Sequence, residues 1–311
     1  MNDNTRILVT PRSLTAEPHP DVERLRENGF DIVYSRAGQT PTEDELLELV
    51  PGCVGWLAGV EPVTPRVVEA AANLRVISRN GVGIDNLPVD MLAKRGVKIM
   101  IAEGANALGV AELTIGLMFS ALRAIPLADA GIKAGSWPRV RGMEIRDRTV
   151  GIIGCGAIGR EVARMVVALG ARVIAHDPLR PNLDLPSTQF AYREIDEIIA
   201  DAEILSLHCP LPKDGSALLD RQRLSTVRNG LVLVNTARAR LVDEDALIEA
   251  LDLGRIGCYA TDVFEPEPPV DLRLAAHPRV IATSHIGGFT AESVDRATRI
   301  AARNLLSALQ N

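Results

Sequence analysis

The sequence predicts an α/β protein built from two doubly wound domains, each with a parallel sheet covered by helices on both faces. Three observations predict this class. Short apolar runs alternate with helical patterns, the order that parallel strands and crossover helices require. The runs show little polar alternation, as strands covered on both faces do. The length of 311 residues fits two domains at about 100–200 residues each.

The N-terminal third of the chain contains the first series of strands. Signals for the helices between them are clear at two places. Thr64 precedes Pro65, a capping residue followed by proline at the first helical position, and Gly96 follows a helical pattern over residues 91–95. We therefore expect one α/β unit with strands at residues 6–10, 30–34, 54–58, 75–78 and 97–101.

A second series of strands begins after Asp147 and predicts a second doubly wound domain. Between the two series, residues 111–124 form an apolar helical pattern that we expect to be buried between domains or subunits. Residues 290–309 form a last amphipathic helix with Thr290 as its cap. The strands of the second series are expected at residues 149–153, 171–175, 204–208, 231–235, 257–261 and 280–283.

Composition and charge exclude several classes of function. The chain has 34 Lys and Arg against 40 Asp and Glu, and its net charge of −6 has the wrong sign for a protein that binds a nucleic-acid backbone. Aromatic residues make up only 3%, too few for base-stacking platforms. The longest apolar stretch, residues 113–122, is about half of a bilayer span. We expect no nucleic acid, no membrane and no metal site.

Cysteine usage and the N-terminus indicate the compartment. The start of the chain is polar and then strand-like, so we expect no signal peptide. The cysteines form no C-x-x-C pair and lie in apolar or glycine-rich sequence, which is typical of inert core thiols. Together these features predict a reducing, cytoplasmic location. The four cysteines are Cys53, Cys155, Cys209 and Cys258.

The strongest local motif is a glycine fingerprint at Gly154, Gly156 and Gly159, which follows a strand and opens a helix. Such a turn lets the backbone approach a pyrophosphate, while the third glycine lets helix and strand pack closely. The amides near Ala157 and Ile158 would point toward the anion. The motif predicts a Rossmann dinucleotide site; the alternative is only a tight strand-to-helix turn.

Asp177 ends the next strand, where this fold places an acceptor for the adenosine ribose hydroxyls. A carboxylate there would repel a 2′-phosphate, so NAD is favoured over NADP, although Arg180 could complicate that choice. The alternative is a turn residue before Pro178. We expect residues that follow the neighbouring strands to complete the cofactor site: Cys209, Pro210, Thr236, Ala237, Gly287 and Gly288.

Three further strand ends carry charged or titratable residues. Arg238 follows one strand, Glu265 and Glu267 follow the next, and His285 follows the last. In an open α/β sheet the carboxyl ends of the strands form the edge where ligands bind. A cation, a carboxylate and an imidazole beside a nicotinamide suffice for dehydrogenation. Taken singly, each is more often a solvated charge, a turn residue or a structural histidine; His208 is expected to line the cofactor cleft.

With these motifs the chain closely resembles the D-isomer-specific 2-hydroxyacid dehydrogenases over nearly its whole length. The resemblance implies Arg238 as the substrate-binding arginine, Glu267 as the partner carboxylate and His285 as the acid–base. It also implies that Asp262 contacts the nicotinamide carboxamide. One departure is Ala239, where the family commonly has glycine.

The loop at residues 78–86 resembles the family's substrate loop, although it could be an ordinary glycine-rich turn. The resemblance implies that the amides of Val82 and Gly83 hold the substrate carboxylate, and that Arg238 and His285 also contact the substrate. Arg79 is the local cation and a candidate for contacting the substrate or a phosphate on it. The resemblance further implies a homodimer formed through residues 111–142.

The resemblance implies domains that are not consecutive in the chain. Residues 1–102 with 289–311 would form a flavodoxin-like substrate-binding domain, and residues 103–288 a Rossmann NAD-binding domain, with a cleft between them. The expected reaction interconverts a D-2-hydroxy acid and its 2-keto acid with NAD. 3-Phosphoglycerate is one candidate substrate; the alternatives are a glyoxylate or hydroxypyruvate reductase, a formate dehydrogenase, and a corepressor-like protein that binds NAD(H).

Overall fold

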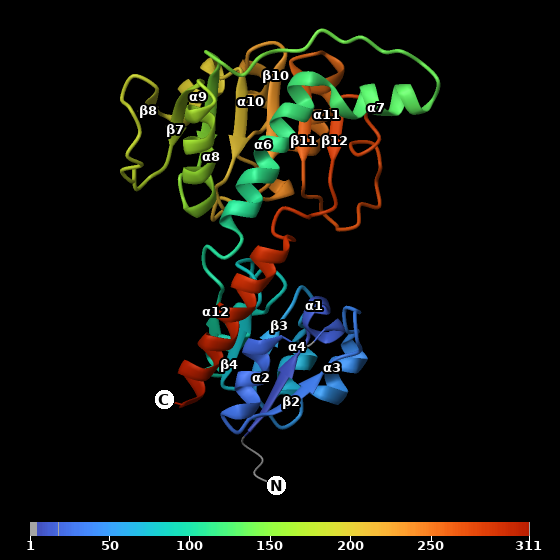
Figure 1. The fold of residues 1–311 in the computed structure, drawn as a ribbon, viewed down its shortest axis with the longest axis vertical. Coiled ribbons are helices and arrows are strands. Elements are labelled where there is room, and N and C mark those ends of the chain that lie inside the picture. The colour runs from blue at the N-terminus through green and yellow to red at the C-terminus, as the bar shows by residue number, and fades with distance from the viewer. Residues whose placement is uncertain (1–4, 18, 311) are drawn as a thin grey trace. The chain divides into compact units, whose positions relative to one another are not determined.

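The computed structural model describes residues 5–17 and 19–310. The chain divides into two compact units, Met1–Asn106 with Gly288–Asn311 and Ala107–Gly287 (Figure 1). The first unit is therefore discontinuous, and the second is inserted into it. The divisions fall at residues 106/107 and 287/288, close to the positions expected from the motifs.

The first unit contains a five-stranded sheet of order β2-β1-β3-β4-β5, in which every pairing is parallel. The strand predictions for this unit are confirmed, with small shifts at the ends. The strands are β1 (Arg6–Val9), β2 (Asp31–Tyr34), β3 (Cys53–Ala58), β4 (Val76–Arg79) and β5 (Lys98–Met100).

The helices of this unit begin where the sequence signals place them. The Thr64 side chain accepts the Val67 N–H at 3.4 Å, and the Thr290 side chain accepts the Ser293 N–H at 3.1 Å. The last helix, α12, packs on β3 and β4 and so completes the first unit from the far end of the chain (Figure 1). The helices are α1 (Arg12–Ala16), α2 (Pro20–Glu27), α3 (Glu43–Leu49), α4 (Pro65–Ala70), α5 (Val89–Lys94) and α12 (Ala291–Gln310).

The second unit contains a seven-stranded parallel sheet of order β12-β11-β10-β9-β6-β7-β8. The predicted doubly wound class is confirmed. The edge strand β8 is not predicted; it is defined by its pairing with β7. The strands are β6 (Thr149–Ile153), β7 (Arg172–His176), β8 (Phe190–Tyr192), β9 (Ile204–Leu207), β10 (Leu231–Asn235), β11 (Ile256–Thr261) and β12 (Val280–Ala282).

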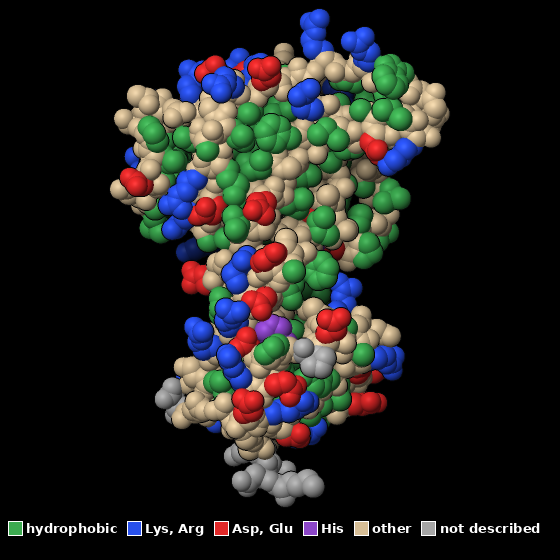
Figure 2. Space-filling model, in the orientation of Figure 1, with side chains coloured by type: hydrophobic (Ala, Val, Ile, Leu, Met, Phe, Trp, Pro, Cys, Tyr) green, Lys and Arg blue, Asp and Glu red, His purple; other side chains and the backbone are tan. Residues whose placement is uncertain are grey.

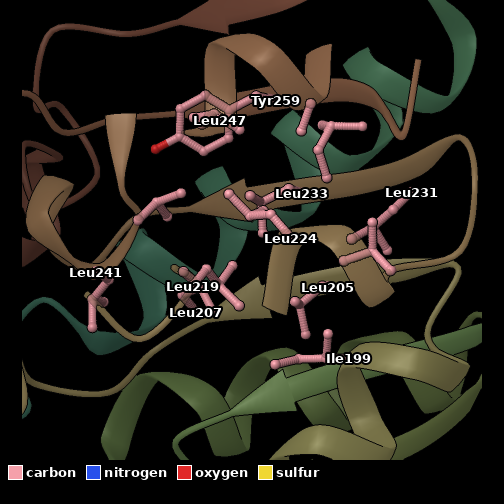
Figure 3. Close-up of a cluster of buried hydrophobic side chains, with 14 of the residues drawn as sticks. Ile199, Leu205, Leu207, Leu219, Leu224, Leu231, Leu233, Leu241, Leu247 and Tyr259 are labelled. Carbon is pink, nitrogen blue, oxygen red and sulfur yellow. The ribbon is translucent and has the colours of Figure 1, made fainter. Parts of the chain in front are cut away.

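The core of the second unit explains why its strands are apolar throughout. Side chains alternate along β10: Leu231 and Leu233 pack with helices on one face, whereas Val232 and Val234 pack on the other. Figure 3 shows the first of these clusters, in which Tyr259 of β11 is also buried. Because both faces are covered, a strand with polar alternation would place polar side chains in a core.

The helix predicted over residues 111–124 is confirmed as α6, which ends at Arg123. A further helix that was not predicted, α7, follows Ala124, whose backbone is left-handed with φ of 50°. Among the described residues no single helix is long and apolar enough to cross a bilayer; only α6 and α7 together meet that test, bent by 65°. The helices are α6 (Ala107–Arg123), α7 (Ile125–Lys133), α8 (Ala157–Ala168), α9 (Ile195–Asp201), α10 (Arg221–Thr226), the 3₁₀ helix η1 (Ala239–Leu241) and α11 (Glu244–Asp252).

Candidate active site

The parallel sheet of the second unit brings the predicted site residues to one edge. Arg238 follows β10, Glu267 follows β11 and His285 follows β12, and these three strands are neighbours. The glycine loop and Asp177 follow β6 and β7 at the same edge. Strands that run in one direction deliver the loops after them to one side of the sheet. Residues far apart in the sequence therefore share one rim.

His285 and Glu267 are in direct contact. The imidazole Nδ1 lies 2.8 Å from Oε2 of Glu267 and 3.0 Å from its Oε1. The same carboxylate accepts the Phe264 N–H at 3.0 Å, which fixes its orientation. The other ring nitrogen, Nε2, faces away from the carboxylate because the two nitrogens lie on opposite sides of the imidazole. The pair is therefore arranged to present Nε2 to a reacting group.

Asp262 holds the backbone that follows His285 and the side chain of Thr283 before it. It is only 2% exposed. One oxygen accepts the Ile286 N–H at 2.8 Å and the Thr283 hydroxyl at 2.6 Å, and the other accepts the Gly287 N–H at 2.8 Å. His285 itself has a left-handed backbone with φ of 54°, a conformation that persists only where the surroundings impose it.

Sequence reasoning did not predict this second role of Asp262, nor Thr283. The only signal was a hydroxyl two residues before the histidine, which is too common to be informative alone. Each oxygen of a carboxylate has two lone pairs, so Asp262 keeps capacity for the predicted contact to a carboxamide. That contact stays a prediction.

The loop of Arg238 is fixed by its neighbours in the second unit. The Asn235 side chain donates to the Arg238 carbonyl at 2.9 Å, and Arg238 Nη1 donates to the Ala237 carbonyl at 2.8 Å. Arg240 lies 3.9 Å from Glu265 and joins this loop to the one that follows β11. The two neighbouring glutamates of that loop therefore have different partners, Arg240 for the first and the imidazole for the second.

The glycine loop has the geometry of a dinucleotide site. Gly154 has φ of 97°, and a Cβ there would lie 2.4 Å from the His208 carbonyl oxygen. A Cβ on Gly159 would lie 1.9 Å from the Gly154 carbonyl oxygen, whereas a Cβ on Gly156 would meet nothing within 4 Å. Gly156 opens α8 without a side-chain cap. The first N–H groups of the helix and the open space beside Gly156 fit a pyrophosphate.

Asp177 is tied to the glycine loop. One of its oxygens accepts the Cys155 N–H at 2.8 Å and the other accepts the Leu179 N–H at 2.9 Å. Arg180, the cation that could favour NADP, pairs with Glu194 at 2.8 Å. The carboxylate is thus held at the strand end where NAD places its ribose hydroxyls.

His208 lies beside the glycine loop and is suited to lining a cofactor site. Its Nε2 lies 2.8 Å from the Ser206 hydroxyl, and its Nδ1 is buried without a partner among the residues that the structure describes. Burial lowers the pKa of this imidazole to about 3, so the ring is neutral at physiological pH.

The first unit places Arg79 and the predicted substrate loop at the carboxyl end of β4. The N–H groups of Val82 and Gly83 have no hydrogen-bond acceptor within residues 5–17 and 19–310, as an anion site requires. Arg79, by contrast, is only 6% exposed and donates to backbone carbonyls of the Gly59 and Gly83 loops. The expected contact between its guanidinium and substrate has little support in this geometry.

Comparison with known proteins identifies the class. Residues 115–287 match the family described as D-isomer specific 2-hydroxyacid dehydrogenase, NAD binding domain. A hydroxypyruvate reductase of Thermotoga maritima is 37% identical over 260 residues, which cover 82% of this chain and 84% of that protein. The chain belongs to the D-isomer specific 2-hydroxyacid dehydrogenases. It is an NAD-dependent oxidoreductase of this family.

Other relatives show the range of the family. A D-3-phosphoglycerate dehydrogenase of Methanocaldococcus jannaschii is 38% identical over 302 residues, 96% of this chain; the chain spans 57% of that relative's length. The crystal structure of a glyoxylate reductase from Paecilomyes thermophila superposes with a TM-score of 0.85 at 28% identity, covering 100% of this chain and 97% of that one. These relatives leave the substrate open.

The glycine loop generates a prediction with a matched pair of variants. Gly156→Ala should leave the melting temperature close to that of the parent, because its new methyl group meets no protein atom. It should raise the Kd for NADH about tenfold or more, since the methyl occupies the space of the pyrophosphate. Gly159→Ala should lower the melting temperature, because its methyl overlaps the Gly154 carbonyl. Calorimetry and NADH fluorescence titration separate the two; unchanged NADH binding in Gly156→Ala would contradict the site.

Proposed function

We propose that this enzyme interconverts a small, unphosphorylated D-2-hydroxy acid and its 2-keto acid, with hydroxypyruvate or glyoxylate as the keto acid. The observation that carries the proposal is the contact of His285 with Glu267, at 2.8 Å, on the rim that also carries Arg238. A titratable ring held by a carboxylate is what proton transfer at a hydroxyl requires. The relatives include a hydroxypyruvate reductase and D-3-phosphoglycerate dehydrogenases, so the choice of an unphosphorylated acid depends on the charges of the substrate loop.

In the proposed mechanism Arg238 binds the substrate carboxylate and the C2 oxygen through its planar fork. The N–H groups of Val82 and Gly83 are also proposed to bind the substrate carboxylate. Binding of the carboxylate and of the C2 oxygen orients C2, and orientation supplies a large part of the rate. NAD(H), when bound, accepts or supplies the hydride.

His285 moves the proton. In reduction its Nε2 donates a proton to the oxygen of the keto group, which becomes the hydroxyl; in oxidation Nε2 takes that proton back. Glu267 accepts from Nδ1, so it selects the tautomer and stabilises the imidazolium. Asp262 keeps the ring in place through the N–H groups of the two residues that follow it and through the Thr283 hydroxyl before it.

The proposed absence of a phosphate on the substrate follows from the charges of the substrate loop. A phosphate group is usually bound by arginine or lysine side chains. Arg79 is the one cation of residues 78–86, and its guanidinium is buried against backbone carbonyls. The alternative, 3-phosphoglycerate, is favoured by the Methanocaldococcus relative and would need another cation, for which exposed Arg12 at the carboxyl end of β1 is the candidate.

A substrate panel tests the proposal. We expect oxidation of NADH with hydroxypyruvate or glyoxylate, with kcat/KM at least about tenfold above that for the keto acid of 3-phosphoglycerate, a difference of about 1.4 kcal/mol. Preference for the phosphorylated acid, abolished by Arg12→Ala, would establish the alternative. Stoichiometric NADH binding without turnover of any acid would instead indicate a binding protein.

The acid–base assignment has its own test. His285→Ala should lower kcat by about 10²–10⁴-fold, because general acid–base catalysis contributes that much, while the Kd for NADH stays within about twofold. Glu267→Gln should also lower kcat. The matched control is Glu265→Gln, whose carboxylate lies near Arg240 and should leave kcat unchanged. Near-normal turnover in His285→Ala would overturn the assignment.

We also propose that the protein is a homodimer in which α7 and the segment after it form the interface. Apolar side chains on this segment are exposed, among them Ile132 at 57% and Trp137 at 78%, and Figure 2 shows hydrophobic side chains at the surface over α7. Exposed apolar patches of this kind usually mark protein–protein contacts. A hollow on the same elements is lined by Phe119, Arg123, Ile125, Ala128, Asp129 and Ile132.

Ile132→Glu tests the interface. A charge placed in an apolar contact should convert the dimer into a monomer, so the mass measured by light scattering at micromolar concentration should fall by about half. The matched control is Leu253→Glu, an apolar residue equally exposed, at 65%, at the end of α11. A parent protein that is already monomeric would refute the proposal.

The cysteines support a reducing compartment such as the cytoplasm. All four are free thiols. Burial raises the pKa of Cys155, Cys209 and Cys258 to about 11, so each is protonated and unreactive at neutral pH. None of them is positioned as a nucleophile or disulfide partner.

A further inference from the structure

We propose that Arg79 and Glu61 are positioning residues, whose hydrogen bonds on the buried side of the loop of residues 81–83 hold it in the conformation that binds a carboxylate. In this proposal the positive charge of Arg79 attracts the substrate carboxylate without contacting it. The inference rests on the proposed role of the Val82 and Gly83 amides. It assigns a task to two buried charged side chains that the reaction itself does not use.

The burial of these side chains requires an explanation. Glu61 is 1% exposed and Arg79 is 6% exposed, although charged residues are rarely buried without partners. Removing a charge from water costs several kcal/mol unless hydrogen bonds replace the water. In this unit the replacements are peptide groups of the loops that follow β3 and β4, so the burial is linked directly to loop structure.

Arg79 lies directly behind the substrate loop. Its Nε donates to the Gly83 carbonyl at 2.7 Å, and its Nη2 would lie 3.7 Å from a Cβ built on Gly81. The loop carbonyl is thus turned inward to the guanidinium. The N–H groups of Val82 and Gly83 are left without an acceptor among the described residues. One side chain therefore fixes the orientation that makes the loop an anion site.

Glu61 fixes the neighbouring loop, against which Arg79 packs. Its carboxylate accepts the Gly59 N–H at 3.0 Å and the Thr10 hydroxyl, and Arg79 Nη1 donates to the Gly59 carbonyl. Both backbone groups of Gly59 therefore have a buried charged partner: Glu61 accepts its N–H, and Arg79 donates to its carbonyl. The Asn86 side chain donates to the Glu61 carbonyl at 2.6 Å, which ties down the far end of the substrate loop.

The positive charge of Arg79 adds to the effect of these hydrogen bonds. Burial lowers the pKa of the guanidinium, but the charges of Glu61 and Asp85 oppose that change, and an arginine stays protonated in proteins. A positive charge behind the loop, shielded from water, strengthens the attraction of the loop amides for a carboxylate. Burial raises the pKa of Glu61, while its hydrogen bonds to the Thr10 hydroxyl and the Gly59 N–H oppose that change.

Hydrogen exchange in the protein without substrate provides the decisive test. Arg79→Met should speed exchange of the hydrogen-bonded N–H groups on either side of the loop, those of Gly59, Asn80 and Leu87, by about tenfold, because the two loops lose the guanidinium that joins them. The matched control is Arg75→Met, an exposed arginine just before the same strand, which should leave this exchange unchanged. Arg79→Lys keeps the positive charge but loses the planar set of N–H donors, so it should give an intermediate exchange rate. It replaces Arg79→Met in this test if that variant fails to fold.

Steady-state kinetics provide the second readout. Arg79→Met should raise the KM for the keto acid and the Ki of oxamate, a carboxylate probe, by about tenfold, with the Kd for NADH within about twofold. A raised KM with unchanged exchange would mean that Arg79 contacts substrate directly, which overturns the inference. Unchanged exchange and unchanged KM would overturn it as well.

Faster exchange without any effect on KM or Ki would show that the loop does not bind the carboxylate, and would refute the Val82 and Gly83 assignment of the proposed function instead. Glu61→Ala extends the test, since it removes the acceptor of the Gly59 N–H and should speed exchange of the same N–H groups. Unchanged hydrogen exchange in Glu61→Ala would show that Glu61 is not a positioning residue.

Discussion

The parallel alignment of the strands is the constraint on which the site depends. In the larger sheet each strand bonds to neighbours that run in the same direction, so each loop after a strand emerges at one edge. Six of the loops there carry predicted site residues, from the glycine turn after β6 to His285 after β12. No side chain has to reach across the sheet. The same alignment requires both faces to be covered, and the apolar strand sequences follow from that burial.

Buried charged side chains hold the functional loops in both units. Asp262 accepts the two N–H groups that follow His285, and Arg79 donates to the carbonyls of the loops around residues 59 and 83. In each case the charge is removed from water and satisfied by peptide groups, and the bonds to a charged group are the stronger kind. Such bonds hold a loop of mostly small residues, which has few apolar side chains of its own to pack. The left-handed backbone of His285 is maintained in this way.

Prediction succeeded where local signals and burial agree. The long apolar runs gave the strands within about one residue at each end, and Thr64 and Thr290 cap helices as their positions suggested. It failed where the deciding cause is not local. The sequence did not predict α7, which begins after the left-handed Ala124, and β8 exists because it pairs with the edge of β7.

The sequence by itself determined the two α/β units, the glycine turn, the acid at the end of β7 and the order of the residues proposed for catalysis, because each depends on short-range pattern or on the direction of a strand. Only the tertiary structure decided which partners these residues have. In the folded chain the carboxylate of Glu267 contacts the His285 imidazole, whereas the carboxylate of Glu265 lies near Arg240. It also turned Arg79 inward and paired the peptide groups around it with Glu61. Hydrogen-bond partners far apart in the chain are set by packing, and a sequence pattern records which residues are present but not which way their side chains turn.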